Sequence, residues 1–208
     1  MELQYYGANC LRITTKKANI IIDGLTSEGK SLIKDDETAL FTEFKERTIN
    51  NRPKLIIDRP GEYEVADTSI VGIPARSYKG EEKTLDNIIY KIECEDIKLA
   101  IIGNIHPQLT DTQLELLGEV NVVVVPVGNH DVTLSGSDAL SIIRNIEPYI
   151  VIPTHFSDTD IKYETPQSTL KDALKELAMD PSETVSKLKL KSSNFNEGDT
   201  IKLIVLES

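Results

Sequence analysis

The 208-residue sequence lacks most of the short motifs that mark a catalytic or metal site. It has only two cysteines, Cys10 and Cys94, without a CxxC pair or the Cys/His spacing of a structural zinc site, so we expect two buried, reduced thiols. No GxSxG elbow, P-loop or GxGxxG pattern is present. The sequence therefore predicts none of the catalytic or nucleotide sites that these motifs build.

Long apolar runs and a basic surplus are also missing. No run is long enough to span a bilayer, and the N-terminal segment lacks the basic and then apolar pattern of a signal peptide. We therefore expect a cytoplasmic protein without membrane association. Acidic residues outnumber basic ones by 34 to 23, for a net charge of −11. Because non-specific binding to nucleic acid or anionic membrane needs a basic surface, we expect neither partner.

Histidine is equally scarce, but its placement is informative. The only three, His106, His130 and His155, come after the apolar runs of LAIIGNIHP, VNVVVVPVGNH and YIVIPTHF. Short continuous apolar runs that end in a turn signal are typical of buried strands. In α/β sheets the ends of such strands commonly display functional side chains. The three histidines are therefore the first candidates for a site.

The order of the remaining patterns predicts one α/β domain over residues 1–208. Short strand-like runs fill the first half, and EYEVADTSIVGIPA alternates as two strands. NIIYKIEC and KLAIIG predict a hairpin that turns at Glu95-Asp96. The second half alternates buried strands with three helices, expected at 110–118, 135–148 and 168–178, and ends in a pair of strands. We expect two sheets, or one large mixed sheet, with helices outside.

Several segments resemble the metallo-β-lactamase superfamily, in its small bacterial and archaeal branch of zinc-dependent hydrolases. The similar segments, in family order, are LQYYGANCLRI, ANIIIDG, IDRPGEYEVADTSIVGIPA, NIIYKIE, IIGN, LTDTQLELLGEVNVVVVPVG and IEPYIVIPTHF. PGEYEV and LTDTQLELLG resemble this branch in particular. The resemblance covers nearly the whole chain. It implies a four-layer αβ/βα sandwich with the site at one edge, between the two sheets.

The resemblance also implies a chemistry. In the family, an HxHxDH motif, a further histidine, an aspartate and a last histidine hold two zinc ions. The ions lower the pKa of a bridging water, which then attacks an ester, lactone, amide or phosphodiester.

This sequence departs from that pattern at most ligand positions. Of the family ligands only His155 is retained, and no histidine precedes His106. Lysine and arginine carry no lone pair at neutral pH and repel a dication. A neutral amide is a poor bridge between two metals. The substituted ligand positions are Glu43, Lys45, Arg47, Thr48, Ser77 and Asn104.

Three hypotheses for function follow. We favour a degenerate, non-catalytic binding or scaffold protein with no cofactor. The first alternative is a hydrolase of a small ester or phosphate with a single relocated zinc ion, for which the candidate ligands are His106, His130, His155 and Asn104 or Asp131. The second is a metal-free protein that binds a phosphate or carboxylate in the old cleft through Lys45, Arg47 and the histidines.

Smaller expectations concern charges and edges. The charges of Glu43, Lys45, Glu46 and Arg47 predict either an ion-paired plug in the cleft or a solvated charged run. Asp23 is expected to orient neighbouring loops by accepting backbone N–H bonds. Pairing of the edge segment LKLKS between two chains, which gives a homo-oligomer, stays open.

Overall fold

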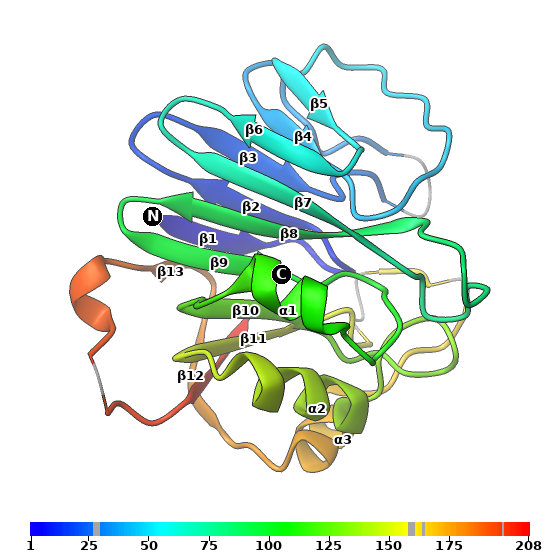
Figure 1. Cartoon of the computed structure of the whole chain (residues 1–208), viewed down its shortest axis with the longest axis vertical. Helices are drawn as coiled ribbons and strands as arrows, with labels where there is room; N and C mark the ends of the chain where they lie inside the picture. Colours follow the sequence, from blue (N-terminus) through cyan, green and yellow to red (C-terminus); the bar gives the residue numbers. More distant parts are fainter. Residues whose placement is uncertain (27–29, 158–160, 164, 197) are drawn as a thin grey trace.

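Two β-sheets packed face to face form the centre of the protein (Figure 1). The computed structural model describes residues 1–26, 30–157, 161–163, 165–196 and 198–208. In spatial order the six-stranded sheet holds β13 (Leu188–Lys189), β1 (Glu2–Tyr5), β2 (Leu11–Thr14), β3 (Asn19–Ile22), β4 (Thr38–Leu40) and β5 (Leu55–Ile57). The eight-stranded sheet holds β12 (Pro181–Val185), β14 (Lys202–Leu206), β11 (Ile150–Thr154), β10 (Val122–Pro126), β9 (Ile97–Ile101), β8 (Asn87–Cys94), β7 (Ser69–Ala75) and β6 (Gly61–Glu64).

The burial of each strand follows its sequence pattern. In β2, Leu11 and Ile13 are buried while the residues between and after them are partly or fully exposed, as alternation requires. All five residues of β10 are buried, because this strand lies between the parallel neighbours β9 and β11 with both faces covered. The inward faces of both sheets share one apolar core. The mixed α/β fold with two sheets confirms the predicted fold class.

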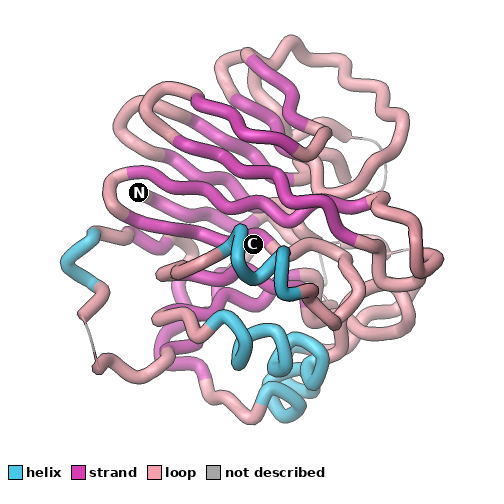
Figure 2. Tube along the Cα trace, viewed as in Figure 1, coloured by secondary structure: helices cyan, strands magenta, loops and turns pink. Residues whose placement is uncertain are grey.

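Three capped α-helices follow the parallel strands, close to their predicted positions. They are α1 (Asp111–Leu117), α2 (Gly136–Ile146) and α3 (Leu170–Leu177), and a short 3₁₀ helix, η1, spans Ser192–Asn194. The side chains of Thr110, Ser135 and Thr169 accept backbone N–H bonds at the three α-helical N-termini. Thr110 and Ser135 also form capping boxes with the residues three positions on. Figure 2 shows these helices beside the β10–β12 side of the molecule.

The outer face of the six-stranded sheet is covered by irregular chain. In the part of the chain that the structure describes, every helix comes after β9. The outward side chains of this sheet, among them Ile21, Ala39 and Phe41, form a second cluster with Ile33. Ile49, from the connection between β4 and β5, packs against this cluster. Loops thus replace helices in the layer where a helix is expected, because residues 41–54 lack a 3.6-residue apolar period.

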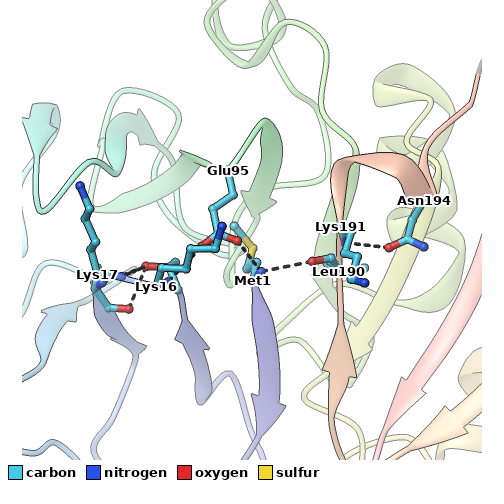
Figure 3. A network of polar contacts seen from close by, with 9 residues as sticks. Met1, Lys16, Lys17, Glu95, Leu190, Lys191 and Asn194 are labelled. Carbon is cyan, nitrogen blue, oxygen red and sulfur yellow. Dashed lines mark hydrogen bonds and ion pairs between the residues drawn. The ribbon is translucent and has the colours of Figure 1, made fainter.

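The two sheets are joined at one end by a network around Met1 (Figure 3). The Met1 ammonium group donates to Glu95 Oε2 at 2.8 Å and to the Leu190 carbonyl oxygen at 3.2 Å. Glu95 Oε1 also accepts the backbone N–H of Lys16 at 3.0 Å. Glu95 and Asp96 form the predicted turn between β8 and β9, with φ of 55° and 59°. This turn of the eight-stranded sheet is therefore fixed to β1 and to the β2–β3 turn of the other sheet.

The chain end differs from the expected pair of strands. Segment 179–191 contains two strands that join different sheets. β12 runs parallel to β14, whereas β13 crosses to the six-stranded sheet and pairs with β1. The polar pair Ser186-Lys187 lies between them, and a hydropathy pattern does not reveal the change of sheet. Among the described residues, no helix has the length and apolar character needed to cross a membrane.

Candidate functional site

The three histidines follow parallel strands that lie side by side. β9, β10 and β11 are neighbours in the eight-stranded sheet, and His106, His130 and His155 follow them in that order. The carboxyl ends of parallel strands meet at one edge of a sheet. The sequence therefore placed the histidines at the correct edge, but their side chains have different environments.

His155 is buried and bound within the protein. Only 8% of the residue is exposed to solvent, and its backbone φ is 57°. The ring Nδ1 lies 3.2 Å from Gln167 Oε1, and the ring centroid lies 5.4 Å from that of Tyr163. Its backbone N–H donates to the Ala8 carbonyl at 2.8 Å. Burial lowers the pKa of His155 below its usual value, so the ring is neutral at pH 7.

The other two histidines lie in loops. His130 is exposed at the centre of a turn in which Asn129, His130 and Asp131 all have positive φ. His106 is half-buried, and its Nδ1 accepts the backbone N–H of Gln108 at 3.3 Å. Burial, followed by the nearby charge of Arg76, lowers the pKa of His106.

A hollow of about 240 Å³ gathers most of the substituted ligand positions. Four of the six predicted positions line it, namely Glu43, Lys45, Ser77 and Asn104. Asp131, the candidate oxygen donor, also lines the hollow. None of the described residues that line it is a histidine. The structure thus brings the substituted positions together and leaves the histidines outside the hollow.

Four side chains from distant parts of the sequence are hydrogen-bonded across this edge, with Lys45 at one end. Asn104 follows β9, and its Nδ2 donates to Glu43 Oε1 at 3.4 Å while its Oδ1 accepts from Asn9 Nδ2 at 2.9 Å. Thr154, at the end of β11, donates to Asn9 Oδ1 at 3.3 Å. Lys45 Nζ lies 2.7 Å from Glu43 Oε2. We call these five residues the cleft network.

The Glu43 carboxyl of the cleft network stays ionised beside the Lys45 ammonium group. Burial raises the pKa of the Glu43 carboxyl, but the Lys45 ammonium, with Asn104 and Arg47, outweighs burial and holds the pKa below its usual value. Glu43 is therefore ionised at neutral pH and paired. Of the two predictions for this charged segment, the ion pair matches Glu43 and Lys45, whereas Glu46 is exposed.

Asp23 has the orienting role that the sequence predicted. It follows β3 with φ of 45°, its Oδ1 accepts the Thr42 backbone N–H at 3.0 Å, and its Oδ2 accepts the Thr42 hydroxyl at 2.6 Å. Burial raises the pKa of Asp23 to about 6, against the opposing effect of the two Thr42 bonds. Gly103, with φ of 66°, packs on the other side of Thr42.

Two predicted positions face elsewhere. Arg47 and Thr48 line a second, larger cavity of about 850 Å³ on the far side of Phe44 and Lys45. The Arg47 guanidinium stacks on the Phe41 ring at 4.2 Å from its centroid. In the described part of the chain no histidine lines either of these two cavities, so neither joins Arg47 to the histidines as the second alternative proposed.

Sequence analysis missed three partners of the site. Asn9 joins Asn104 to Thr154, Asp86 accepts from the backbone N–H and hydroxyl of Ser77 at 2.8 and 3.0 Å, and Gln167 contacts the His155 ring. Only Asn9 had a usable signal, because it lies in the GANC turn of the opening segment that resembles the family.

The donor chemistry does not fit a dinuclear zinc centre. A zinc site needs about three protein ligands even in its simplest catalytic form. Within the described ranges, no group of three or more His, Cys, Asp or Glu side chains is placed to hold a metal ion. Asn104 offers a neutral amide, and Glu43 is paired with an ammonium group.

Comparison with known proteins assigns the family. The model of the β-lactamase superfamily domain matches residues 2–155, which is most of the chain. The protein belongs to the β-lactamase superfamily. Curated protein sequences give no match.

Solved structures of the superfamily share the fold. A proposed Zn-dependent hydrolase of the metallo-β-lactamase superfamily from Thermotoga maritima is 23% identical, with a TM-score of 0.75 and 100% of both chains covered. A proposed metal-dependent hydrolase from Parabacteroides distasonis is 18% identical, with a TM-score of 0.61, and the match covers 86% of this chain and 90% of that one. The metallo-β-lactamase fold protein YhfI from Bacillus subtilis is 7% identical, with a TM-score of 0.59 and 100% and 97% covered. At these identities the likeness describes the fold of this superfamily member and not its activity.

Proposed function

We propose that this superfamily member is a non-catalytic binding or scaffold protein that has lost the dinuclear zinc centre. The observation that carries the proposal is the cleft network, whose side chains bond one another at the edge where the family holds its metals. Two of its residues, Glu43 and Lys45, follow β4. Asn104 follows the parallel strand β9, and Thr154 is the last residue of the parallel strand β11.

Charge supports the proposal. In the family, the cations balance the acidic ligands, and here the Lys45 ammonium lies 2.7 Å from the Glu43 carboxylate. The pair balances its own charge, and a dication placed beside Lys45 would be repelled. The low pKa of Glu43 keeps this arrangement intact at neutral pH.

Hydrogen bonding supports it as well. The side-chain amide of Asn104 donates to Glu43 and accepts from Asn9, and its backbone carbonyl accepts from Asn87 Nδ2 at 3.0 Å. A metal at this position would have to break these bonds, and each buried polar group left unpaired costs ~1–3 kcal/mol. The side chains thus satisfy one another without a metal.

A hydrolase with one relocated zinc has less support. His155 is buried against Gln167 and Tyr163, whereas His130 is exposed in its turn and His106 contacts Gln108. Three imidazoles must converge within ~2.0–2.1 Å of one ion to bind zinc, and these rings have separate partners.

A hydrolysis screen tests the proposed function. Wild-type protein is incubated with a chromogenic phosphodiester and a chromogenic β-lactam, each with EDTA, with added Zn²⁺ and with added Mn²⁺. We expect no turnover above the metal-only blank. The proposal is overturned by metal-dependent turnover that is abolished in His155→Ala or Asn104→Ala but retained in the control Arg52→Gln, whose side chain is exposed.

A further inference from the structure

The larger cavity is a consequence of how β4 connects to β5. These strands are parallel, with Ala39 opposite Ile56, so the chain must cross back over the sheet between them. Such crossovers usually contain a helix that fills the space over the sheet. Residues 41–54 contain none, and the cavity of about 850 Å³ lies between this crossover and β5. Figure 1 shows the crossover as a wide loop beside β5.

Part of the cavity lining is apolar. Phe41 belongs to the outer cluster of the six-stranded sheet, and Ile49 packs against that cluster from the crossover. Ile56 of β5 is 44% exposed, which is unusual for a large aliphatic strand residue, and its side chain lines the cavity together with Phe44. A ligand with an apolar or aromatic body would cover surface that is otherwise open to water.

Three cations line the same cavity. They are Lys45, Arg47 and Arg59, against the two acids Glu46 and Asp58, in a chain whose net charge is −11. In the part of the chain that is described, neither guanidinium lies within ion-pair distance of a carboxylate. Because Lys45 is paired with Glu43, the positive groups that remain for an anionic ligand are these two guanidiniums.

Arg47 is held in place by its neighbours, whereas Arg59 is exposed and more loosely placed, and both keep donors free. Arg47 stacks on Phe41 and donates to the carbonyls of Glu43 and Lys45 at 2.5 and 2.9 Å. Arg59 lies 5.4 Å from the centroid of the Phe44 ring and donates to the Asp58 carbonyl at 3.4 Å. A guanidinium has five N–H donors, so each retains several for an oxyanion. Stacking fixes the planar group and lowers the entropy lost on binding.

We propose that this cavity binds a small organic anion, whose apolar or aromatic body lies on Phe44 and Ile56 and whose carboxylate or phosphate is bound by Arg47 and Arg59. The volume falls within the roughly 300–1,000 Å³ of small-molecule sites, and charge-assisted bonds to guanidinium are the strong ones for such groups. The inference rests on the proposed binding function, for which it names the ligand class. Lys45 lines both the smaller hollow, where it pairs with Glu43, and the larger cavity.

The test uses the full-length protein and 8-anilinonaphthalene-1-sulfonate, an aromatic anion whose fluorescence rises in an apolar site. We expect saturable binding at one probe per chain at neutral pH. Arg47→Gln and Arg59→Gln should each weaken it about tenfold, which corresponds to ~1.4 kcal/mol. The matched control is Arg52→Gln, which removes the same charge from an exposed residue of the same crossover that does not line the cavity. Circular dichroism and thermal melting confirm that each variant is folded.

Competition separates the two parts of the ligand. We expect 1-naphthoate and 1-naphthyl phosphate to displace the probe, and their relative affinities tell which oxyanion is preferred. Displacement by the neutral 1-naphthol at the same concentration would overturn the anionic part of the proposal. Ile56→Ala should weaken the probe and the naphthyl ligands but not inorganic phosphate.

Other outcomes separate this inference from the proposed function. Absence of saturable binding, or equal affinities for Arg47→Gln, Arg59→Gln and Arg52→Gln, would overturn the anion site while the hydrolysis screen stays negative. Metal-dependent turnover with intact, arginine-dependent probe binding would instead overturn the non-catalytic function and leave the anion site standing.

Discussion

Replacing Asp23 by asparagine should change the pH dependence of stability. Asp23 bonds Thr42 through both carboxylate oxygens. Asparagine is nearly the same size, tolerates the positive φ and accepts the Thr42 backbone N–H, while its amide donates to the hydroxyl. The variant therefore keeps the contact and removes one ionisation.

The magnitude comes from the pKa of Asp23, which burial raises from 3.8 to about 6. Because the folded state binds this proton more tightly than the unfolded state, the stabilisation is fully present below the unfolded pKa and is lost as the pH rises through about 6. At 1.36 kcal/mol per pKa unit the loss is about 3 kcal/mol, an order-of-magnitude value. Relative to wild type, Asp23→Asn should therefore gain up to that amount between about pH 4 and about pH 7.

Urea denaturation at a series of pH values measures this difference. The control is Asp96→Asn, which has a similarly positive φ of 59° but an exposed side chain in the β8–β9 turn. We expect the control to follow wild type at every pH. If the free energy of unfolding of Asp23→Asn follows the same pH dependence as wild type across this range, the pKa of the Asp23 carboxyl is not raised by burial.

Three further changes test other parts of the structure. Tyr90→Phe removes a buried hydroxyl whose single hydrogen is shared between the backbone carbonyls of Phe41 and Ile57, at 2.9 and 3.0 Å. The change should lower the free energy of unfolding, measured in urea, by ~1–3 kcal/mol. Gly103→Ala should cost about 2 kcal/mol or more, since φ is +66° and a Cβ would lie 2.9 Å from that of Thr42; an unchanged melting temperature would contradict this packing. Cys10, whose pKa burial raises to about 12, should react with Ellman's reagent only on unfolding, and rapid labelling of the native protein would refute its burial.

The fold was largely predictable because its signals are local. Continuous apolar runs such as VVVVP mark strands buried on both faces, and the candidate caps, Thr110 or Asp111 and Ser135 or Ser137, fix the helix starts to within two residues. The switch of β13 to the other sheet was not predictable, since its two-residue pairing with β1 depends on tertiary contacts.

The site was predictable only in part, for a physical reason. Buried strands fix where Asn104 and His155 emerge, so the sequence placed them at one edge. Apolar residues do not recur at a regular spacing in the crossover. The sequence therefore did not show that Lys45 pairs with Glu43 while Arg47 stacks on Phe41. The resemblance marks the segment that holds Asn9, but nothing local in the sequence pairs Asn9 with Asn104, 95 residues away.

Metal content of the purified protein decides whether the cleft network has replaced the zinc centre. Protein prepared without chelator, in medium supplemented with zinc, is measured by elemental mass spectrometry beside His155→Ala and the exposed control Arg52→Gln. We predict well below one zinc ion per chain in all three, because the donors at this edge bind one another. Stoichiometric zinc in wild type and Arg52→Gln that is lost in His155→Ala would contradict a metal-free cleft.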